Sequence, residues 1–162
     1  MKADDANTVL AEHHQLLRQL TDQIDDTNAD SREHRNLINQ LLLELDIHMQ
    51  IEDTLYYPAV STVSPLVAIA HAEHRAVSDQ LAAALRTKVN SNDFPVEWDA
   101  FTTTLHHHAA EEERDMFPHA RHLGDTELVA LGAAMTSLLR RRRHSLRTRL
   151  RVRIKSTVMR HL

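Results

Sequence analysis

Two segments of this chain repeat one pattern of side chains that can bind metal. Each segment begins with His, has Glu four positions later and ends with Pro ten positions after the His; the segments span residues 48–58 and 108–118. On a helix, residues four apart lie on the same face, so the His and the Glu of each segment can approach one ion together. The repetition at an offset of 60 residues therefore predicts two equivalent half-sites.

A second, shorter pattern is also duplicated. Glu12-His13 and Glu73-His74 are 61 residues apart, and an apolar residue follows each His three positions later. We expect His13 and His74 each to complete the coordination of one ion, whereas Glu12 and Glu73 either support a ligand or lie at the surface. A set of His and carboxylate ligands suits a pair of iron ions, although manganese accepts the same donors.

The register of the second segment has an alternative. His107 and Glu111 have the same spacing as His108 and Glu112. We favour His108 and Glu112 because they continue the apolar stripe through Leu105 and reproduce the distance to the following Pro. A buried carboxylate in an apolar stripe needs a partner, and a metal cation supplies one.

Two further residues are candidates for catalysis. Tyr56 lies four residues after Glu52, where its hydroxyl could either bond locally or bind a ferric ion as a phenolate. His71 lies one turn before His74 and is the best spare ligand or proton donor. Tyr57 ranks below Tyr56 because regular helical spacing points it away from His48. We interpret the remaining histidines as ordinary surface or core residues: His14, His34, His106, His107, His119, His122 and His144.

The elements that carry these residues are predicted from apolar spacing. Stripes at three- and four-residue intervals predict helices over about 8–27, 31–60, 65–89, 95–123 and 125–139. Short connections between the first four favour an all-α fold, an antiparallel up-down-up-down four-helix bundle with a fifth C-terminal helix. Each of the first four stripes is interrupted near its middle by His or by His and Glu.

Composition supports this class and excludes others. The 162 residues include only two Gly and four Pro, but thirteen His. The absence of Cys excludes disulfides, thiolate zinc sites, iron–sulfur clusters and cysteine nucleophiles. No segment has the length of a transmembrane helix and the N-terminus lacks an apolar leader, so we expect a cytoplasmic protein.

Charge divides the chain into two parts. All 23 acidic residues precede position 128, whereas ten of the 19 Lys and Arg lie in residues 140–162. We therefore expect a bundle over 1–139 and a basic tail over 140–162. No DNA-reading motif accompanies the tail, so we expect it to be a solvated arm or an oligomer contact rather than a nucleic-acid arm. We expect the protein to be a monomer or a weak homo-oligomer.

The two His-and-Glu segments resemble the hemerythrin-like (HHE cation-binding) family over about residues 8–122, and the wider chain looks like the hemerythrin-like proteins of mycobacteria. This resemblance implies a four-helix bundle that holds an oxo-bridged centre of two iron ions. Carried over position by position, it implies these ligands: His13, His48, Glu52, His74, His108 and Glu112. Oxygen-carrying hemerythrins have a further His where this chain has Ser78, and iron–sulfur repair relatives carry a Cys-bearing segment that is absent here.

The resemblance also implies a function. We expect a di-iron oxidoreductase that decomposes hydrogen peroxide in a catalase-like reaction, consumes nitric oxide with peroxide, or does both. The alternative is a module that binds or senses O2, NO or iron without turnover, with the basic tail as its output. In both cases the expected partners are small molecules. Tyr56 and His71 are the only residues that we single out for proton transfer.

Overall fold

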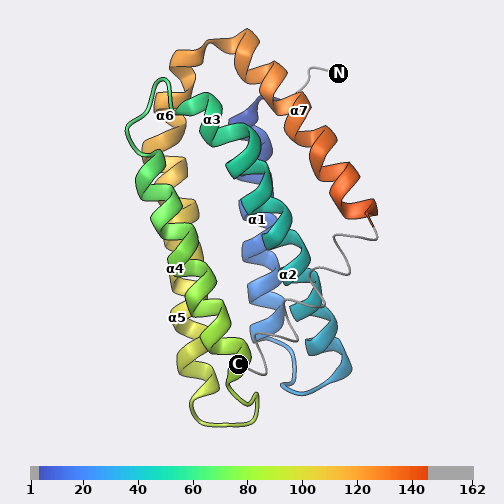
Figure 1. The fold of residues 1–162 in the computed structure, drawn as a ribbon. Coiled ribbons are helices and arrows are strands. Elements are labelled where there is room, and N and C mark those ends of the chain that lie inside the picture. Colours follow the sequence, from blue (N-terminus) through green and yellow to red (C-terminus); the bar gives the residue numbers. More distant parts are fainter. Residues whose placement is uncertain (1–3, 146–162) are drawn as a thin grey trace.

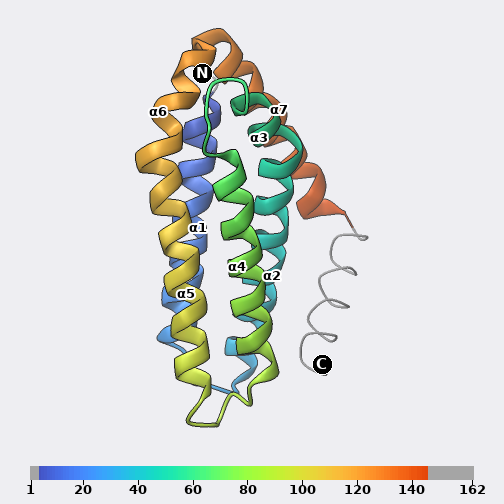
Figure 2. The same cartoon turned by 60° about the vertical axis from the view of Figure 1, so that its left-hand side comes forward.

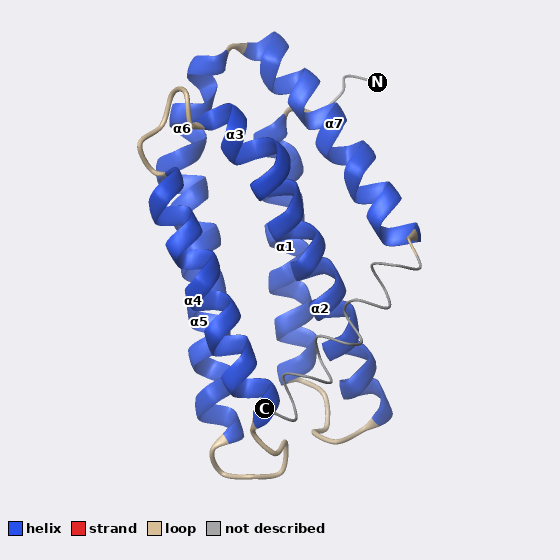
Figure 3. Cartoon of the chain, in the orientation of Figure 1, coloured by secondary structure: helices blue, strands red, loops and turns tan. Residues whose placement is uncertain are grey.

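Five helices of 18 to 20 residues make up most of the protein (Figure 1). The computed structural model describes residues 4–145, and within that range the chain contains no strand (Figure 3). The elements in chain order are α1 (Ala6–Asp25), α2 (Arg32–Ile51), η1 (Glu52–Tyr56), α3 (Tyr57–Val60), α4 (Val67–Arg86), α5 (Phe94–Glu111), η2 (Glu112–Met116), α6 (Phe117–Ala120), η3 (Arg121–Leu123) and α7 (Asp125–His144).

The helices α1, α2, α4 and α5 run alternately down and up and form the four-helix bundle (Figures 1 and 2). α1 packs beside α2, and α4 packs beside α5. α7 turns back at the top of the bundle and lies against α1 and α2. The all-α class, the four-helix bundle and the fifth C-terminal helix are thus confirmed.

Local signals in the sequence begin and end these helices. The Asp5 side chain caps α1 by accepting a hydrogen bond of 2.8 Å from the Thr8 amide. Ser31 caps α2 by accepting one of 3.0 Å from the His34 amide. Gly124 has a φ of 90°, a conformation that suits Gly, and the chain reverses there into α7.

Two π-helical turns interrupt the bundle at equivalent places. η1 starts at Glu52 and η2 starts at Glu112, so each follows directly from the long helix before it. A π turn is wider than an α turn and hydrogen bonds five residues ahead rather than four. Such turns are frequent at functional sites, and here they change which side chains share a face after each Glu.

The buried apolar residues form two clusters, one on either side of a polar layer. Along α1, Leu10 belongs to one cluster and Leu17 to the other, with His14 between them. Along α4, Ala70 and Val77 flank His74 in the same way. Burying a Leu or Val side chain contributes about 1.5–3 kcal/mol, so the two clusters hold the polar layer in place.

Two expectations about the rest of the chain can be compared with this fold. The expected boundary between residues 139 and 140 falls inside α7, which continues to His144. The remainder of the basic tail, residues 146–162, lies outside the described residues. Within residues 4–145, no helix combines the length and the apolar character needed to cross a membrane.

Candidate metal centre

His48 and Glu52 lie together at the junction of α2 and η1. Neither is exposed to solvent, and His48 Nε2 is 3.2 Å from Glu52 Oε1. His108 and Glu112 occupy the equivalent junction of α5 and η2, with Nε2 3.9 Å from Glu112 Oε2. His107 and Glu111 form their own pair of 3.4 Å, but the His107 side chain is 65% exposed. The structure therefore brings His108 and Glu112, rather than the alternative register, to the buried layer.

Helix α4 adds His74 to this layer. Its Nε2 lies 2.9 Å from Glu52 Oε2, and the side chain is 8% exposed. His108 Nε2 approaches the same Glu52 oxygen at 3.8 Å. Glu52 thus lies between histidines from α2, α4 and α5.

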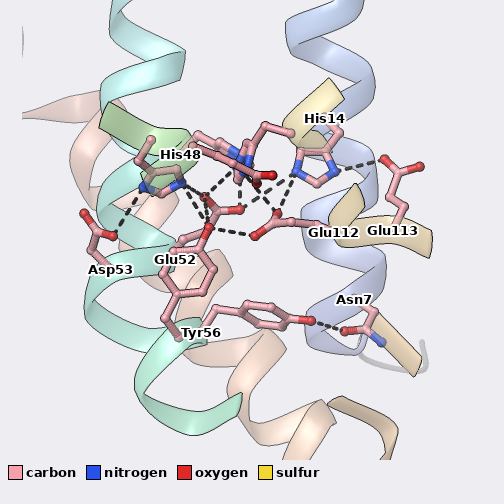
Figure 4. A network of polar contacts seen from close by, with 12 residues as sticks. Asn7, His14, His48, Glu52, Asp53, Tyr56, Glu112 and Glu113 are labelled. Atoms are coloured by element: carbon pink, nitrogen blue, oxygen red, sulfur yellow. Dashed lines mark hydrogen bonds and ion pairs between the residues drawn. The ribbon is translucent and has the colours of Figure 1, made fainter. Parts of the chain in front are cut away.

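Helix α1 contributes His14, which the sequence-based interpretation had set aside in favour of His13. His14 Nε2 lies 3.3 Å from Glu112 Oε2 and 3.8 Å from Glu52 Oε1 (Figure 4). His13 instead turns its Nε2 to Glu44 on α2, at 3.0 Å. Both histidines are buried on α1, and both fit the spacing of the apolar stripe, so helical periodicity alone did not separate them.

The duplication itself contains the signal that identifies His14. At one constant offset of 60 residues, six positions correspond: His13 with Glu73, His14 with His74, His48 with His108, Glu52 with Glu112, Asp53 with Glu113, and Tyr57 with Phe117. Pairing His13 with His74 requires a different offset, of 61. A uniform offset is what an internal duplication of two helical hairpins produces.

Several buried atoms of this layer have no hydrogen-bond partner. They include Nε2 of His14, His48 and His108, Nδ1 of His48 and His74, and the carboxylate atoms Glu52 Oε1 and Glu112 Oε2. Leaving such atoms unsatisfied costs roughly 1–3 kcal/mol each, and native proteins rarely tolerate it. Imidazole nitrogens and carboxylate oxygens that face one another in this way fit the donor set of a transition-metal cation.

Two groups of potential ligands can be distinguished by distance. One contains His14, His48, Glu52 and Glu112, and the other contains Glu52, His74 and His108; within each group the ligand atoms lie within 4.8 Å of one another. Glu52 belongs to both groups. A carboxylate with its two oxygens in separate groups can bridge two ions.

Carboxylates outside the cluster hydrogen bond to two of the histidines, and a third carboxylate lies near His74. His14 Nδ1 lies 2.9 Å from Glu113 Oε1, which also accepts a bond of 3.0 Å from Arg18. His108 Nδ1 lies 2.9 Å from Glu73 Oε2, and His74 Nδ1 lies 3.4 Å from Asp53 Oδ1. The hydrogen bonds at His14 and His108 hold the proton on Nδ1 and leave Nε2 for a metal, whereas His74 Nδ1 has no hydrogen bond. Glu73 therefore supports a ligand, whereas Glu12 is exposed.

The fourth histidine, His48, lacks a carboxylate at Nδ1. The ring of His13, the counterpart of Glu73, lies edge-on to it with the ring centroids 5.1 Å apart. The two halves of the cluster consequently differ in what supports their histidines.

Electrostatics in the metal-free cluster favour bound protons. Burial would lower the pKa of His108, but hydrogen bonds to Glu52 and Glu73 outweigh burial and raise that pKa to about 10. The pKa of His14 is also raised, since bonding to Glu112 and Glu113 outweighs burial. Burial lowers the pKa of His48. Metal binding must displace the protons on the first two rings, so it should release protons.

The two tyrosines are placed differently from the sequence-based ranking. Tyr56, a candidate ligand from the sequence, donates its hydroxyl to Asn7 Oδ1 at 2.8 Å and points away from the cluster (Figure 4). Tyr57 donates to Glu112 Oε1 at 2.6 Å and lies 3.0 Å from His74 Nε2. The π turn explains the difference, because it brings the residue five positions after Glu52, rather than four, over the site.

Two other aromatic or imidazole rings border the site. Phe117, the counterpart of Tyr57, stacks on His14 with an interplanar angle of 8°. His71 is 44% exposed, lies 3.3 Å from Asp53 and packs edge-on against Tyr57. His71 is therefore at the rim of the cluster and outside its buried core.

A helical bundle with a buried layer of four histidines and two glutamates defines a class of cation-binding proteins. Comparison with known proteins agrees with this class. The model of the hemerythrin HHE cation-binding domain matches residues 5–120, and the chain therefore belongs to that family.

Relatives from mycobacteria are similar over most of the chain. Rv2633c of Mycobacterium tuberculosis and Mb2666c of Mycobacterium bovis are each 40% identical over 142 residues, which is 86% of this chain and 88% of theirs. A crystal structure of an HHE cation-binding domain protein from Mycobacterium kansasii, described as an Rv2633c homolog, is also similar. It superposes with a TM-score of 0.87 at 42% identity, over 96% of this chain and 99% of that one.

Proposed function

We propose that this protein binds two iron ions and uses them to decompose hydrogen peroxide, to consume nitric oxide with peroxide, or both. The observation that carries the proposal is the position of Glu52 in both groups of potential ligands, among buried donor atoms without partners. The ligands that we propose are His14, His48, Glu52, His74, His108 and Glu112.

Two irons held by these six residues would supply the two-electron redox chemistry that conversion of two H2O2 into two water molecules and one O2 requires. The residues of the chain prepare the site for this. Glu73 and Glu113 fix the ring orientation of His108 and His14 by hydrogen bonds, and Asp53 lies beside His74. Phe117 and the apolar clusters on either side keep bulk water from the polar layer.

We propose Tyr57 either as a proton donor at the site or, as a phenolate, as a ligand of a ferric ion. Burial raises the pKa of Tyr57, and the neighbouring Glu52 and Glu112 raise it further. The metal-free phenol therefore keeps its proton and donates a hydrogen bond to Glu112. A ferric ion nearby would favour the phenolate instead. The role that we expected for Tyr56 thus passes to Tyr57, while His71, in contact with Tyr57 and half-exposed, stays a candidate for proton exchange with solvent.

The test is metal content per chain and the visible spectrum, followed by oxygen evolution from peroxide. We expect close to two irons per chain and O2 release over many cycles. Protein that takes up no metal after anaerobic ferrous loading would refute the metal centre. Two irons without turnover would refute the enzymatic part alone.

A series of contacts between α7 and the cluster favours the alternative function, a sensor without turnover. Arg143 of α7 binds Glu44 with two nitrogens, and Glu44 binds His13, whose ring touches His48. This series of contacts connects the last turn of α7 to the cluster. A sensor would form one adduct with peroxide or NO and change the accessibility of α7, which limited proteolysis with and without the ligand can measure.

A further inference from the structure

A cavity of about 140 Å³ lies between α4 and the junction of α5 with η2. One side is apolar and includes Ile69 and Met116. The other side is acidic and consists of Glu73, Glu111, Glu112 and Asp115. Among residues 4–145, no Lys or Arg lines the cavity, so the field of these residues attracts cations.

The cavity connects the surface to the cluster through a single side chain. Glu112 lines it, yet Glu112 is only 2% exposed and its Oε2 has no hydrogen-bond partner. The same Glu112 faces His14 at 3.3 Å on the side of the proposed metal centre. Glu112 Oε1 accepts a hydrogen bond from Tyr57 and Oε2 faces the proposed centre, so an ion that reaches Glu112 from the cavity has reached a proposed ligand.

The mouth of the cavity holds a second arrangement of possible ligands. Glu73, His107 and Glu111 each offer an atom within 4.8 Å of the others. Two carboxylates that approach each other in this way are stabilised by a cation between them. Arg114 lies beside Glu111 and Asp115 at the rim, but its side chain is 64% exposed and its charge is screened by solvent.

We propose that this acidic cavity is the entry port through which divalent metal ions reach the buried centre. The ion is first held by Glu73, His107 and Glu111 at the mouth and then passes to Glu112, which belongs to both the port and the centre. This inference rests on the proposed metal centre and adds the route by which it is filled.

The test is the rate of cobalt(II) uptake by metal-free protein, followed by the visible absorption of the bound ion. Cobalt(II) is suitable because it avoids the oxidation of ferrous ion during the measurement. The variant E111Q/D115N removes two charges from the port and spares Glu73, which supports His108. The matched control is D22N/D99N, which removes two exposed charges from α1 and α5 elsewhere in the bundle.

We expect the port variant to take up cobalt(II) about threefold to tenfold more slowly than the wild type at low ionic strength. Its uptake should also depend less on added salt, since steering by charge is screened by ions. The final stoichiometry and spectrum should match those of the wild type, and the control should keep the wild-type rate. I69R, which adds a positive charge at a residue that is 54% exposed, should slow uptake as well.

If E111Q/D115N and I69R both take up cobalt(II) at the wild-type rate, the proposal that this cavity is the entry route is wrong. Equal slowing in the port variant and in the control would also overturn it, because the effect would then follow from net charge. A wild-type protein that binds no cobalt(II) would instead refute the metal centre on which the port depends.

Discussion

At the scale of single residues, neighbouring histidines on α1 have different environments. His14 faces Glu112 and Glu52, whereas His13 faces Glu44. We therefore expect His14→Ala to lower metal affinity at least about tenfold, and to lower the stoichiometry measured after desalting. His13→Ala should keep the wild-type metal content and lose roughly 1–3 kcal/mol of stability, because Glu44 loses a buried partner. Loss of metal in the His13 variant and not in the His14 variant would contradict the assignment.

The adjacent tyrosines allow a second comparison of this kind. Tyr57→Phe removes the donor to Glu112 Oε1 and should alter the visible spectrum and the turnover of the iron-loaded protein. Tyr56→Phe removes only the bond to Asn7 and should cost about 1 kcal/mol without a spectral change. An unchanged spectrum and rate in Tyr57→Phe would exclude both roles proposed for that hydroxyl.

These two pairs also show how far the sequence predicted the site. His48, Glu52, His74, His108 and Glu112 lie together as their spacing predicts. His14 was missed because periodicity allows either of two adjacent residues, although the constant offset of 60 selects it. Tyr57 was ranked too low because the spacing rule assumed an α-helix through Glu52, where the chain forms a π turn. No simple pattern in a single sequence predicts a π turn.

At the scale of helices, the two hairpins differ in what supports their ligands. His108 has Glu73 at its Nδ1, but His48 has the ring of His13 nearby and no carboxylate. The half-site with His74 and His108 also has Tyr57 beside it, where the other has Phe117. The two half-sites thus differ in ligands and in the groups that support them, so we infer that they bind ions with different affinities and fill in sequence.

Glu73→Gln tests this inequality. We expect one of two metal equivalents to weaken about tenfold, since partners of metal-binding histidines contribute to affinity, while the other equivalent changes little. Calorimetric titration of metal-free protein with cobalt(II) measures both. Glu12→Gln, at an exposed Glu that also precedes a His of α1, is the control and should leave the titration unchanged. Equal weakening of both equivalents in Glu73→Gln would contradict the asymmetry.

At the scale of the whole molecule, α7 closes over the N-terminal segment at one position. A Cβ placed on Gly132 would lie 2.7 Å from the Asp5 carbonyl carbon and 2.9 Å from the Ala6 nitrogen, which are backbone atoms that cannot turn aside. Although Ala favours helix over Gly by up to about 1 kcal/mol, we expect Gly132→Ala to destabilise the protein by about 1–2 kcal/mol net. Urea unfolding measures the change. Ala134→Ser, exposed on the same helix, should stay within about 0.5 kcal/mol of the wild type.

The contact of α7 with α2 should make stability depend on pH. Burial would raise the pKa of Glu44, but His13 and Arg143 outweigh burial and lower it below 4.5. A carboxyl group whose pKa is lower in the folded state stabilises the protein above its unfolded pKa, and this contribution is lost as pH falls through the folded value. The difference in unfolding free energy between wild type and Glu44→Gln, measured on metal-free protein, should therefore be constant from about pH 5.5 to 7 and shrink below about pH 4.5. The difference in unfolding free energy between wild type and Arg143→Gln should also shrink below about pH 4.5, because Arg143 is one of the two partners that lower the pKa of Glu44. A difference that is independent of pH for both variants would show that Glu44 does not tie α7 to the bundle through its charge.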